Sequence, residues 1–299
     1  MTTKALAAAA SLVAGFSALA ISLATTTTTA NAAPAPRAAA YDFRNPDSIA
    51  ISGHDAFVAN GDSVTEFNTS TGALVRLISG TAYEFNTLES MAISGGHAFV
   101  VNGRGDSVTE FNRSSGALVR VINGTPYVFM VPYSIAISGG DAFVANEADG
   151  GSVTEFNTAT GALVRVIGGT AYDFIVPDNI AISDGDVVVV KIHGDSVTEF
   201  NRSSGAPVRV IKGAAYDFNV SDSIAISGND VFVANGGDSV TEFNRSSGAL
   251  VRVIKDAAYD FNGPVSIAIS GNDAFVANAN GASVTEFNRS SGALVRVIR

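Results

Sequence analysis

One position of this chain, two residues before an isoleucine or methionine, recurs at a spacing of 42 to 45 residues and is usually acidic. Four of the six aligned positions are carboxylic acids, and the full set is Asp47, Glu89, Tyr133, Asp178, Asp222 and Val265. Carboxylates that are brought together attract cations, and hard ions such as Ca²⁺ prefer oxygen ligands of this kind. Their mutual repulsion raises their pKa values unless a cation or water separates them. The pattern therefore indicates a site for positive charge, provided that the fold gathers these positions.

A sixfold repeat surrounds these positions. Each copy starts at a Tyr-x-Phe pair, and the six tyrosines are Tyr41, Tyr83, Tyr127, Tyr172, Tyr216 and Tyr259. The stretch SVTEFNRSSGALVRVI occurs three times without a changed letter, from Ser107, Ser239 and Ser283. A period in the forties is typical of either four strands or two helices per unit.

The letters of each copy favour strands. In the fifth copy the apolar runs are SIAIS, DVFVAN, SVTEFN and ALVRVI, with β-branched and aromatic residues and no apolar stripe at helical spacing. The segments SGND and NRSSGA between them supply Gly, Asn and Ser for tight turns. One such meander cannot bury both of its faces alone, so six copies are expected to stack around a closed ring. The predicted fold is all-β, a six-bladed β-propeller of four-stranded antiparallel blades over residues 41–299, in a compact ring.

A glutamate in the third run of each copy faces an arginine in the fourth. If the phenylalanine of VTEF lies opposite the leucine of LVRVI, the Glu lies beside the Arg in every copy, as in Glu66 and Arg76. Cross-strand pairs of opposite charge contribute about 0.2–1 kcal/mol each. A pair that recurs six times is interpreted as part of the scaffold.

The first residues predict export. One lysine precedes an apolar stretch that ends at the small residues ANA, which is typical of a secretory signal peptide over residues 1–32. Residues 33–40 are expected to form a flexible mature N-terminus, and the protein is expected to be secreted and extracellular, with no membrane span in its mature form and as a monomer. With no cysteine, the fold depends on burial and not on disulfides. The formal net charge of −10 argues against nucleic acid as a partner.

The repeat resembles a known family. The fifth copy, SIAISGNDVFVANGGDSVTEFNRSSGALVRVI, is similar to the NHL repeat and to the related YVTN-type repeats of bacterial secreted propellers. The resemblance covers residues 41–299 and implies the propeller architecture. The chain departs from the NHL pattern by carrying asparagine where NHL repeats commonly carry aspartate, as at Asn60 and Asn102, and it lacks the arginine often seen at the start of the third strand. No particular NHL activity is therefore implied.

Binding residues are expected where the copies differ, in the loop before the first strand and the loop between the second and third. The fourth copy has KIHGDS where the fifth has NGGDS, and Lys191 and His193 could face the acidic positions there. The predicted ligand-binding residues are Asp47, Glu89, Tyr133, Asp178, Asp222, Lys191 and His193.

Two functions are compatible with these residues. The first is a binding scaffold without catalysis, for a protein, a glycan or a small ligand. The second is a metal-dependent hydrolase or lactonase, or a lyase, with a cation such as Ca²⁺ at the channel mouth. Propeller lactonases and esterases, which this ring resembles only in outline, hold a metal with acidic and Asn side chains at the inner strands. That resemblance implies a metal set of Glu89, Asp178, Asn179 and Asp222. Lyase-type propellers place histidines at the channel, and the matching positions here do not.

Overall fold

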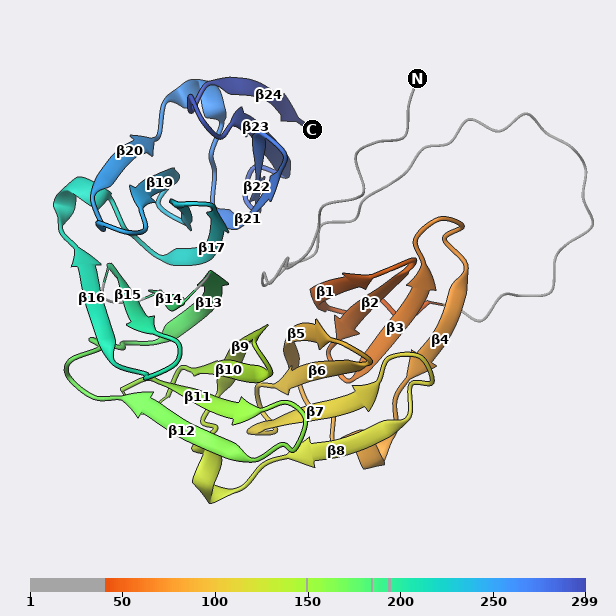
Figure 1. Cartoon of the computed structure of the whole chain (residues 1–299). Coiled ribbons are helices and arrows are strands. Elements are labelled where there is room, and N and C mark those ends of the chain that lie inside the picture. Colours follow the sequence, from red (N-terminus) through yellow and green to blue (C-terminus); the bar gives the residue numbers. More distant parts are fainter. Residues whose placement is uncertain (1–40, 149, 184, 193–194) are drawn as a thin grey trace, which may run out of the picture.

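The computed structural model describes residues 41–148, 150–183, 185–192 and 195–299. Six four-stranded antiparallel sheets follow one another around a central axis, which confirms the predicted propeller (Figure 1). Each sheet, or blade, is formed from one continuous stretch of the chain in the order of its four strands. The predicted leader, residues 1–32, and the predicted flexible segment, residues 33–40, lie outside the described residues.

Each blade has its first strand at the centre of the ring and its fourth at the outer edge (Figure 1). The first strands are β1 (Pro46–Ser52), β5 (Leu88–Ser94), β9 (Pro132–Ser138), β13 (Pro177–Ser183), β17 (Ser221–Ser227) and β21 (Pro264–Ser270). The second strands are β2 (Asp55–Asn60), β6 (His97–Asn102), β10 (Asp141–Asn146), β14 (Asp186–Lys191), β18 (Asp230–Asn235) and β22 (Asp273–Asn278).

The outer half of each blade carries the most repetitive sequence. The third strands are β3 (Ser63–Asn68), β7 (Ser107–Asn112), β11 (Ser152–Asn157), β15 (Ser196–Asn201), β19 (Ser239–Asn244) and β23 (Ser283–Asn288). The fourth strands are β4 (Leu74–Ile78), β8 (Leu118–Ile122), β12 (Leu163–Gly168), β16 (Pro207–Lys212), β20 (Leu250–Ile254) and β24 (Leu294–Ile298). Single 3₁₀ turns precede four of the blades, at η1 (Thr81–Tyr83), η2 (Thr125–Tyr127), η3 (Ala214–Tyr216) and η4 (Ala257–Tyr259). In the described part of the chain, no helix is long and apolar enough to cross a membrane.

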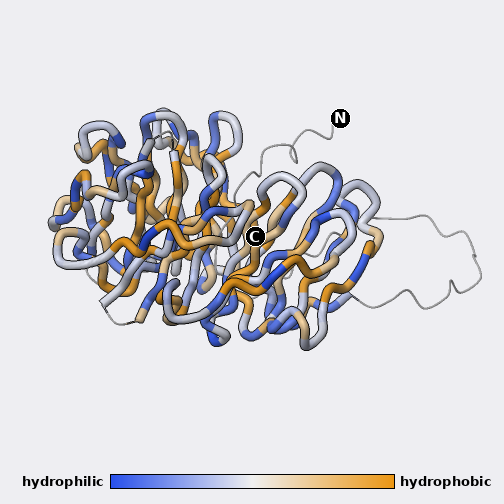
Figure 2. The backbone as a smooth tube through the Cα atoms, turned by 60° about the horizontal axis from the view of Figure 1, so that its bottom comes forward, coloured by the Kyte–Doolittle hydropathy of each residue, from blue (hydrophilic) through white to orange (hydrophobic). Residues whose placement is uncertain are grey.

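The loops gather at two ends of the ring. At one end, the turn between the third and fourth strands meets the turn between the first and second, as where Arg113 N donates to Gly96 O at 2.8 Å. At the other end, the loop between the second and third strands meets the segment that enters the first strand of the same blade, as where Gly103 N donates to Thr87 O at 2.8 Å. These are called the turn end and the rim end below. Figure 2 shows apolar stretches along the strands and more polar stretches in many of the connecting loops.

Five interfaces between consecutive blades, here called seams, are filled by buried apolar clusters. Between the first and second blades, Phe57 and Ile78 pack with Met91 and Phe111. Equivalent positions fill the four seams that follow, from the second blade to the sixth. Burial of apolar surface is the dominant force for folding, and it acts here between repeats. The repeated letters therefore specify the seams.

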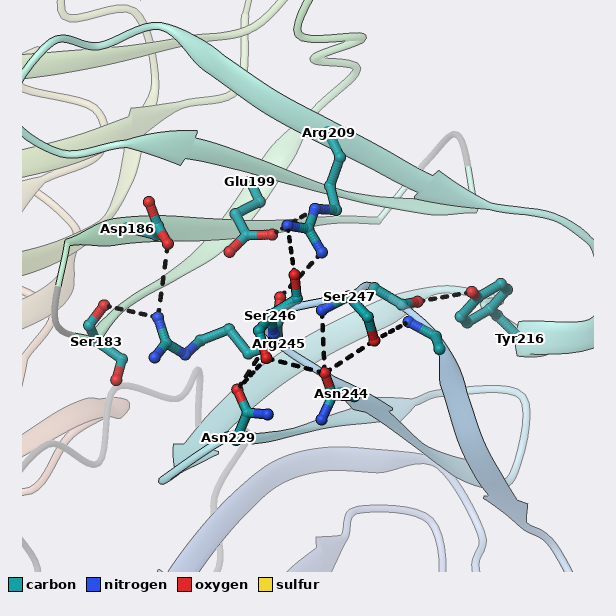
Figure 3. Close-up of polar contacts among 12 residues, drawn as sticks. Ser183, Asp186, Glu199, Arg209, Tyr216, Asn229, Asn244, Arg245, Ser246 and Ser247 are labelled. Atoms are coloured by element: carbon teal, nitrogen blue, oxygen red, sulfur yellow. Dashed lines mark hydrogen bonds and ion pairs between the residues drawn. The ribbon is translucent and has the colours of Figure 1, made fainter.

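An arginine on the fourth strand spans each of these seams, as Figure 3 shows for Arg209 between the fourth and fifth blades. Arg209 Nε lies 3.1 Å from Glu199 Oε2, and Arg209 Nη2 donates to Ser246 O in the turn of the next blade at 3.0 Å. The same contact to the next blade is made by Arg76, Arg120, Arg165 and Arg252. The predicted pairing of Glu with Arg is confirmed in all six blades. Each of these five arginines thus ties two blades together, which the sequence interpretation did not include.

The sixth blade and the first do not meet in such a seam. No buried apolar cluster of the described residues joins them, and Figure 1 shows β21–β24 set apart from β1–β4. Ile298 is 42% exposed, whereas its five counterparts are 3–6% exposed. The side chain of Arg296 is 63% exposed, against 25–29% for the other five arginines. The ring that we expected to be closed has one open junction.

Candidate cation-binding rim

The six aligned positions of the repeat occupy one structural place in every blade, the bulge of the first strand. In β1, Pro46 pairs with Asn60 and Ser48 pairs with Ala59, so Asp47 has no partner residue on β2. The same irregularity falls at Glu89, Tyr133, Asp178, Asp222 and Val265. A β-bulge leaves its extra residue out of the ladder and redirects its side chain. The repeat therefore presents these side chains at equivalent places of the rim end.

The backbone that leads into each bulge is left-handed. The φ angle two residues earlier is 50–63° at Asn45, Thr87, Val131, Val176, Val220 and Gly263. Glycine adopts this conformation freely, whereas a β-branched valine does so at a cost of about 1–3 kcal/mol. The three valines are held there by the surrounding register and not by their own preference. Such strain is concentrated at functional sites in proteins.

Burial raises the pKa of the rim carboxyls. It raises the pKa of Asp47 to about 6 and that of Asp222 to about 6. The pKa of Glu89 rises to about 7, through burial first and then through repulsion by Asp47 and Glu147. Burial also raises the pKa of the Tyr133 hydroxyl, and Asp178 and Glu89 add to that effect. Carboxyl groups from consecutive blades therefore share one electrostatic environment.

Asp178 is the most enclosed member of this group. Its residue is 2% exposed, and its Oδ1 accepts no hydrogen bond from any described residue. Burial raises its pKa well above the usual range, and Asp222, Glu147 and Glu89 raise it further. An unpartnered buried carboxyl oxygen is costly, so its surroundings favour either a proton or a bound cation.

Glu147 is a rim residue that the sequence analysis did not single out. It follows Asn146 in the loop after β10, where the second and fifth blades have Gly103 and Gly236. A Cβ at Gly103 would lie 2.7 Å from the Glu89 side chain, so glycine makes room for the rim acid there. The third blade has Tyr133 at its bulge, and its carboxylate comes from this loop instead. The available signal was the one acidic letter at a position that is glycine in three copies. The acidic rim is defined below as Asp47, Glu89, Tyr133, Glu147, Asp178 and Asp222.

Lys191 does not lie where we expected it. It is fully buried, and its Nζ donates to Asp173 O at 2.8 Å and to Thr198 Oγ1 at 3.0 Å. In other blades an asparagine amide makes the bond to the threonine, as Asn102 Nδ2 does to Thr109 Oγ1 at 2.9 Å. Lys191 therefore replaces a structural asparagine inside its blade. The other predicted basic residue, His193, lies outside the described residues.

The predicted metal set is only partly gathered. Asp178, Asp222 and Glu89 interact electrostatically, and Asn179 is buried next to Asp178 in β13. Among the described residues, however, no three His, Cys, Asp or Glu side chains converge as metal ligands. A metal centre of the lactonase kind remains a prediction.

Comparisons with known proteins agree with the architecture. No protein-family model matches the chain, and no curated protein matches it either. A similar solved structure is the crystal structure of the computationally designed Ika8 protein, with a TM-score of 0.62 and 16% identity. The similarity covers 84% of this chain and 85% of that chain. At this identity it shows the fold alone. The chain is a six-bladed β-propeller, and membership of the NHL or YVTN families stays a prediction.

Proposed function

We propose that this propeller is a binding scaffold that holds a positively charged group of its ligand at the acidic rim. The observation that carries the proposal is Asp178, whose buried Oδ1 lacks a hydrogen-bond donor among the described residues while other carboxyls surround it. A cationic group would offset both the desolvation and the repulsion at this place. The role is one of binding, and no reaction is assigned to the rim.

The chemistry of the rim favours a cationic ligand over a neutral or anionic one. The carboxyls come from five consecutive blades, and those with resolved shifts all have raised pKa values. Bound positive charge lowers such pKa values, so binding near pH 7 releases protons. A polyamine, or a basic side chain of a partner protein, has this property. The signal-like leader further supports a proposal that the scaffold works outside the cell.

Calorimetric titration with spermidine at pH 7.5 tests the proposal. The wild type is compared with a rim variant, Asp47→Asn, Glu89→Gln, Asp178→Asn and Asp222→Asn. The control variant removes four charges at the turn end, by Asp55→Asn, Asp141→Asn, Asp230→Asn and Asp273→Asn. We expect the rim variant to lose binding and the control to keep it. Equal losses in both would show that only net charge matters, and a wild type that binds no spermidine would overturn the proposal.

A second experiment tests whether the cation bound at the rim is Ca²⁺. Metal content and melting temperature are measured before and after chelation. Stoichiometric Ca²⁺ that raises the melting temperature would identify the bound cation as a metal, because a ligand of the native state stabilises it. That result would justify a screen with esters and lactones. Without it, the organic cation stays the better candidate.

A further inference from the structure

The two faces at the open junction carry the same residues that fill the closed seams. The sixth blade presents Phe275, Val284 and Ile298, whose counterparts in the first blade are Phe57, Val64 and Ile78. Those counterparts are 0%, 0% and 4% exposed inside a seam. In the sixth blade, Phe275 and Val284 are only half-buried, and Ile298 is exposed.

The first blade presents the complementary half. Phe67 is half-buried, whereas its five counterparts, Phe111, Phe156, Phe200, Phe243 and Phe287, are 0–1% exposed. Phe43 is 46% exposed and packs edge-on against Phe67, with ring centroids 6.3 Å apart. Three of its five counterparts, Phe129, Phe174 and Phe218, are 4–6% exposed, and the other two, Phe85 and Phe261, are half-buried. Each face is therefore one half of an interface that the molecule builds five times.

Polar groups at the junction repeat this complementarity. Arg296 is held by Glu286, with Nε 2.5 Å from Oε2, as the other arginines are held by their glutamates. In the closed seams the arginine donates to a turn carbonyl of the next blade, as Arg252 does to Ser290 O at 2.9 Å. The matching carbonyl beyond Arg296 is that of Ser70, in the turn of the first blade. An arginine and its acceptor thus stand on opposite faces.

The five seams themselves keep these faces apart. The angle between blades is set by close-packed side chains that are nearly the same at every seam, and packed interiors resist deformation. Closing the ring would require repacking several seams, whereas a second chain can use both faces as they are. Among the described residues, the first sheet contains only β1–β4 and the last only β21–β24, with no strand shared between them.

We propose that a second copy of this chain docks its first blade onto the sixth blade of the first copy, forming a sixth seam between molecules. Such an interface joins different surfaces on the two partners, so it builds a chain of copies or a ring of copies. This proposal replaces the monomer expected from the sequence, and it does not depend on the function of the rim.

Sedimentation of the purified chain over a range of concentrations tests the proposal. The wild type is expected to gain mass with concentration in steps of one chain. Phe275→Asp damages only the sixth-blade face and Phe43→Asp only the first-blade face, so each variant alone is expected to stay a monomer. An equimolar mixture of the two retains one intact pair of faces. It is expected to form dimers and nothing larger.

Val295→Asp is the matched control, because Val295 is 51% exposed on the outer strand β24 and lies in the same blade. We expect it to associate like the wild type, and loss of association in this control would assign the contact to the strand edge instead. A wild type that stays a monomer at all concentrations, with a large loss of melting temperature in Phe275→Asp, would show that the ring closes on itself. Either result would overturn the proposal, as would a mixture that fails to dimerise.

Discussion

The two ends of the ring differ in what the repeats keep. At the turn end, the same asparagine and serine contacts recur: Asn112 Oδ1 accepts from Ser115 N at 3.0 Å, and Asn244 Oδ1 accepts from Ser247 N at 3.0 Å. At the rim end, the bulge position changes from Asp47 to Glu89 to Tyr133 along the ring. The turns at the turn end have the same length in every blade, whereas the rim-end loops between the second and third strands contain two to five residues. The rim end therefore differs from blade to blade in loop length as well as in side chains.

Within one repeat, the seam and turn-end residues are therefore interpreted as serving stability, and the rim residues as serving recognition. The residues of the seams and of the turn end solve a packing problem that every blade shares, and they remain uniform. The rim residues solve no such problem, because burial of their carboxyls raises their pKa values and opposes their charge. The predictions below test this separation, from the largest expected effect to the smallest.

Loss of a seam phenylalanine is expected to have the largest effect. Phe232→Ala removes a ring that is 0% exposed between the fifth and sixth blades, and it should destabilise the fold by about 3–5 kcal/mol. Phe275→Ala makes the same change at the open junction and should cost less than about 1 kcal/mol in dilute, monomeric protein. Urea unfolding of both variants measures the difference. Equal losses would mean that the sixth junction is packed like the others.

Removal of a seam arginine is expected to have the next largest effect. Arg209→Met leaves Glu199 buried without its partner and should cost about 2 kcal/mol at pH 8. The loss should shrink at pH 4, because protonation removes the unpaired charge. Arg296→Met changes an arginine that is 63% exposed at the open junction, so its cost should be smaller than that of Arg209→Met, although Glu286 is also buried. Thermal unfolding at the two pH values checks both, and a pH-independent loss would argue against the role of charge.

Neutralisation of the deepest rim acid is expected to stabilise the protein. The folded pKa of Asp178 is raised, so its contribution to stability is present below its unfolded pKa of about 3.9 and is lost as the pH rises. Asp178→Asn should therefore gain about 1–2 kcal/mol over the wild type at pH 8 and little at pH 4. It should weaken spermidine binding at the same time. A variant that is less stable than the wild type at pH 8 would show that this carboxylate has a partner.

Relief of backbone strain at the rim is expected to have the smallest effect. Val220 has a φ of 50°, and Val220→Gly should gain about 0.5–1 kcal/mol after the added entropy of the unfolded glycine is counted. The reciprocal change, Gly263→Val at a φ of 63°, should lose at least a similar amount, because a Cβ there would also lie 2.5 Å from Asn280 Nδ2. Chemical denaturation measures both. If both substitutions raised the free energy of unfolding, or both lowered it, backbone strain at this position would be contradicted.

The strands and their pairing could be predicted from the sequence because both depend on local patterns. Placement of Phe67 opposite Leu74 predicted the register in which Glu66 faces Arg76, and the structure has both pairs. The open junction could not be predicted, because Phe275, Val284 and Ile298 repeat the letters that fill the closed seams, so the sequence does not distinguish the sixth blade from the others. The burial of Lys191 was missed because the other five copies have asparagine at this position. An asparagine there does not indicate that a lysine in the same place would be buried. Glu147 was missed because it reaches the rim from a different loop.

Backbone amide shift mapping tests the central claim most directly. The chain is titrated with spermidine at pH 7.5, and perturbed amides are assigned to the rim end or to the turn end. The account predicts that perturbations fall at the bulges around Asp47, Glu89, Asp178 and Asp222 and in the loop that holds Glu147. Perturbations concentrated in the turns around Asn112 and Asn244 would contradict it.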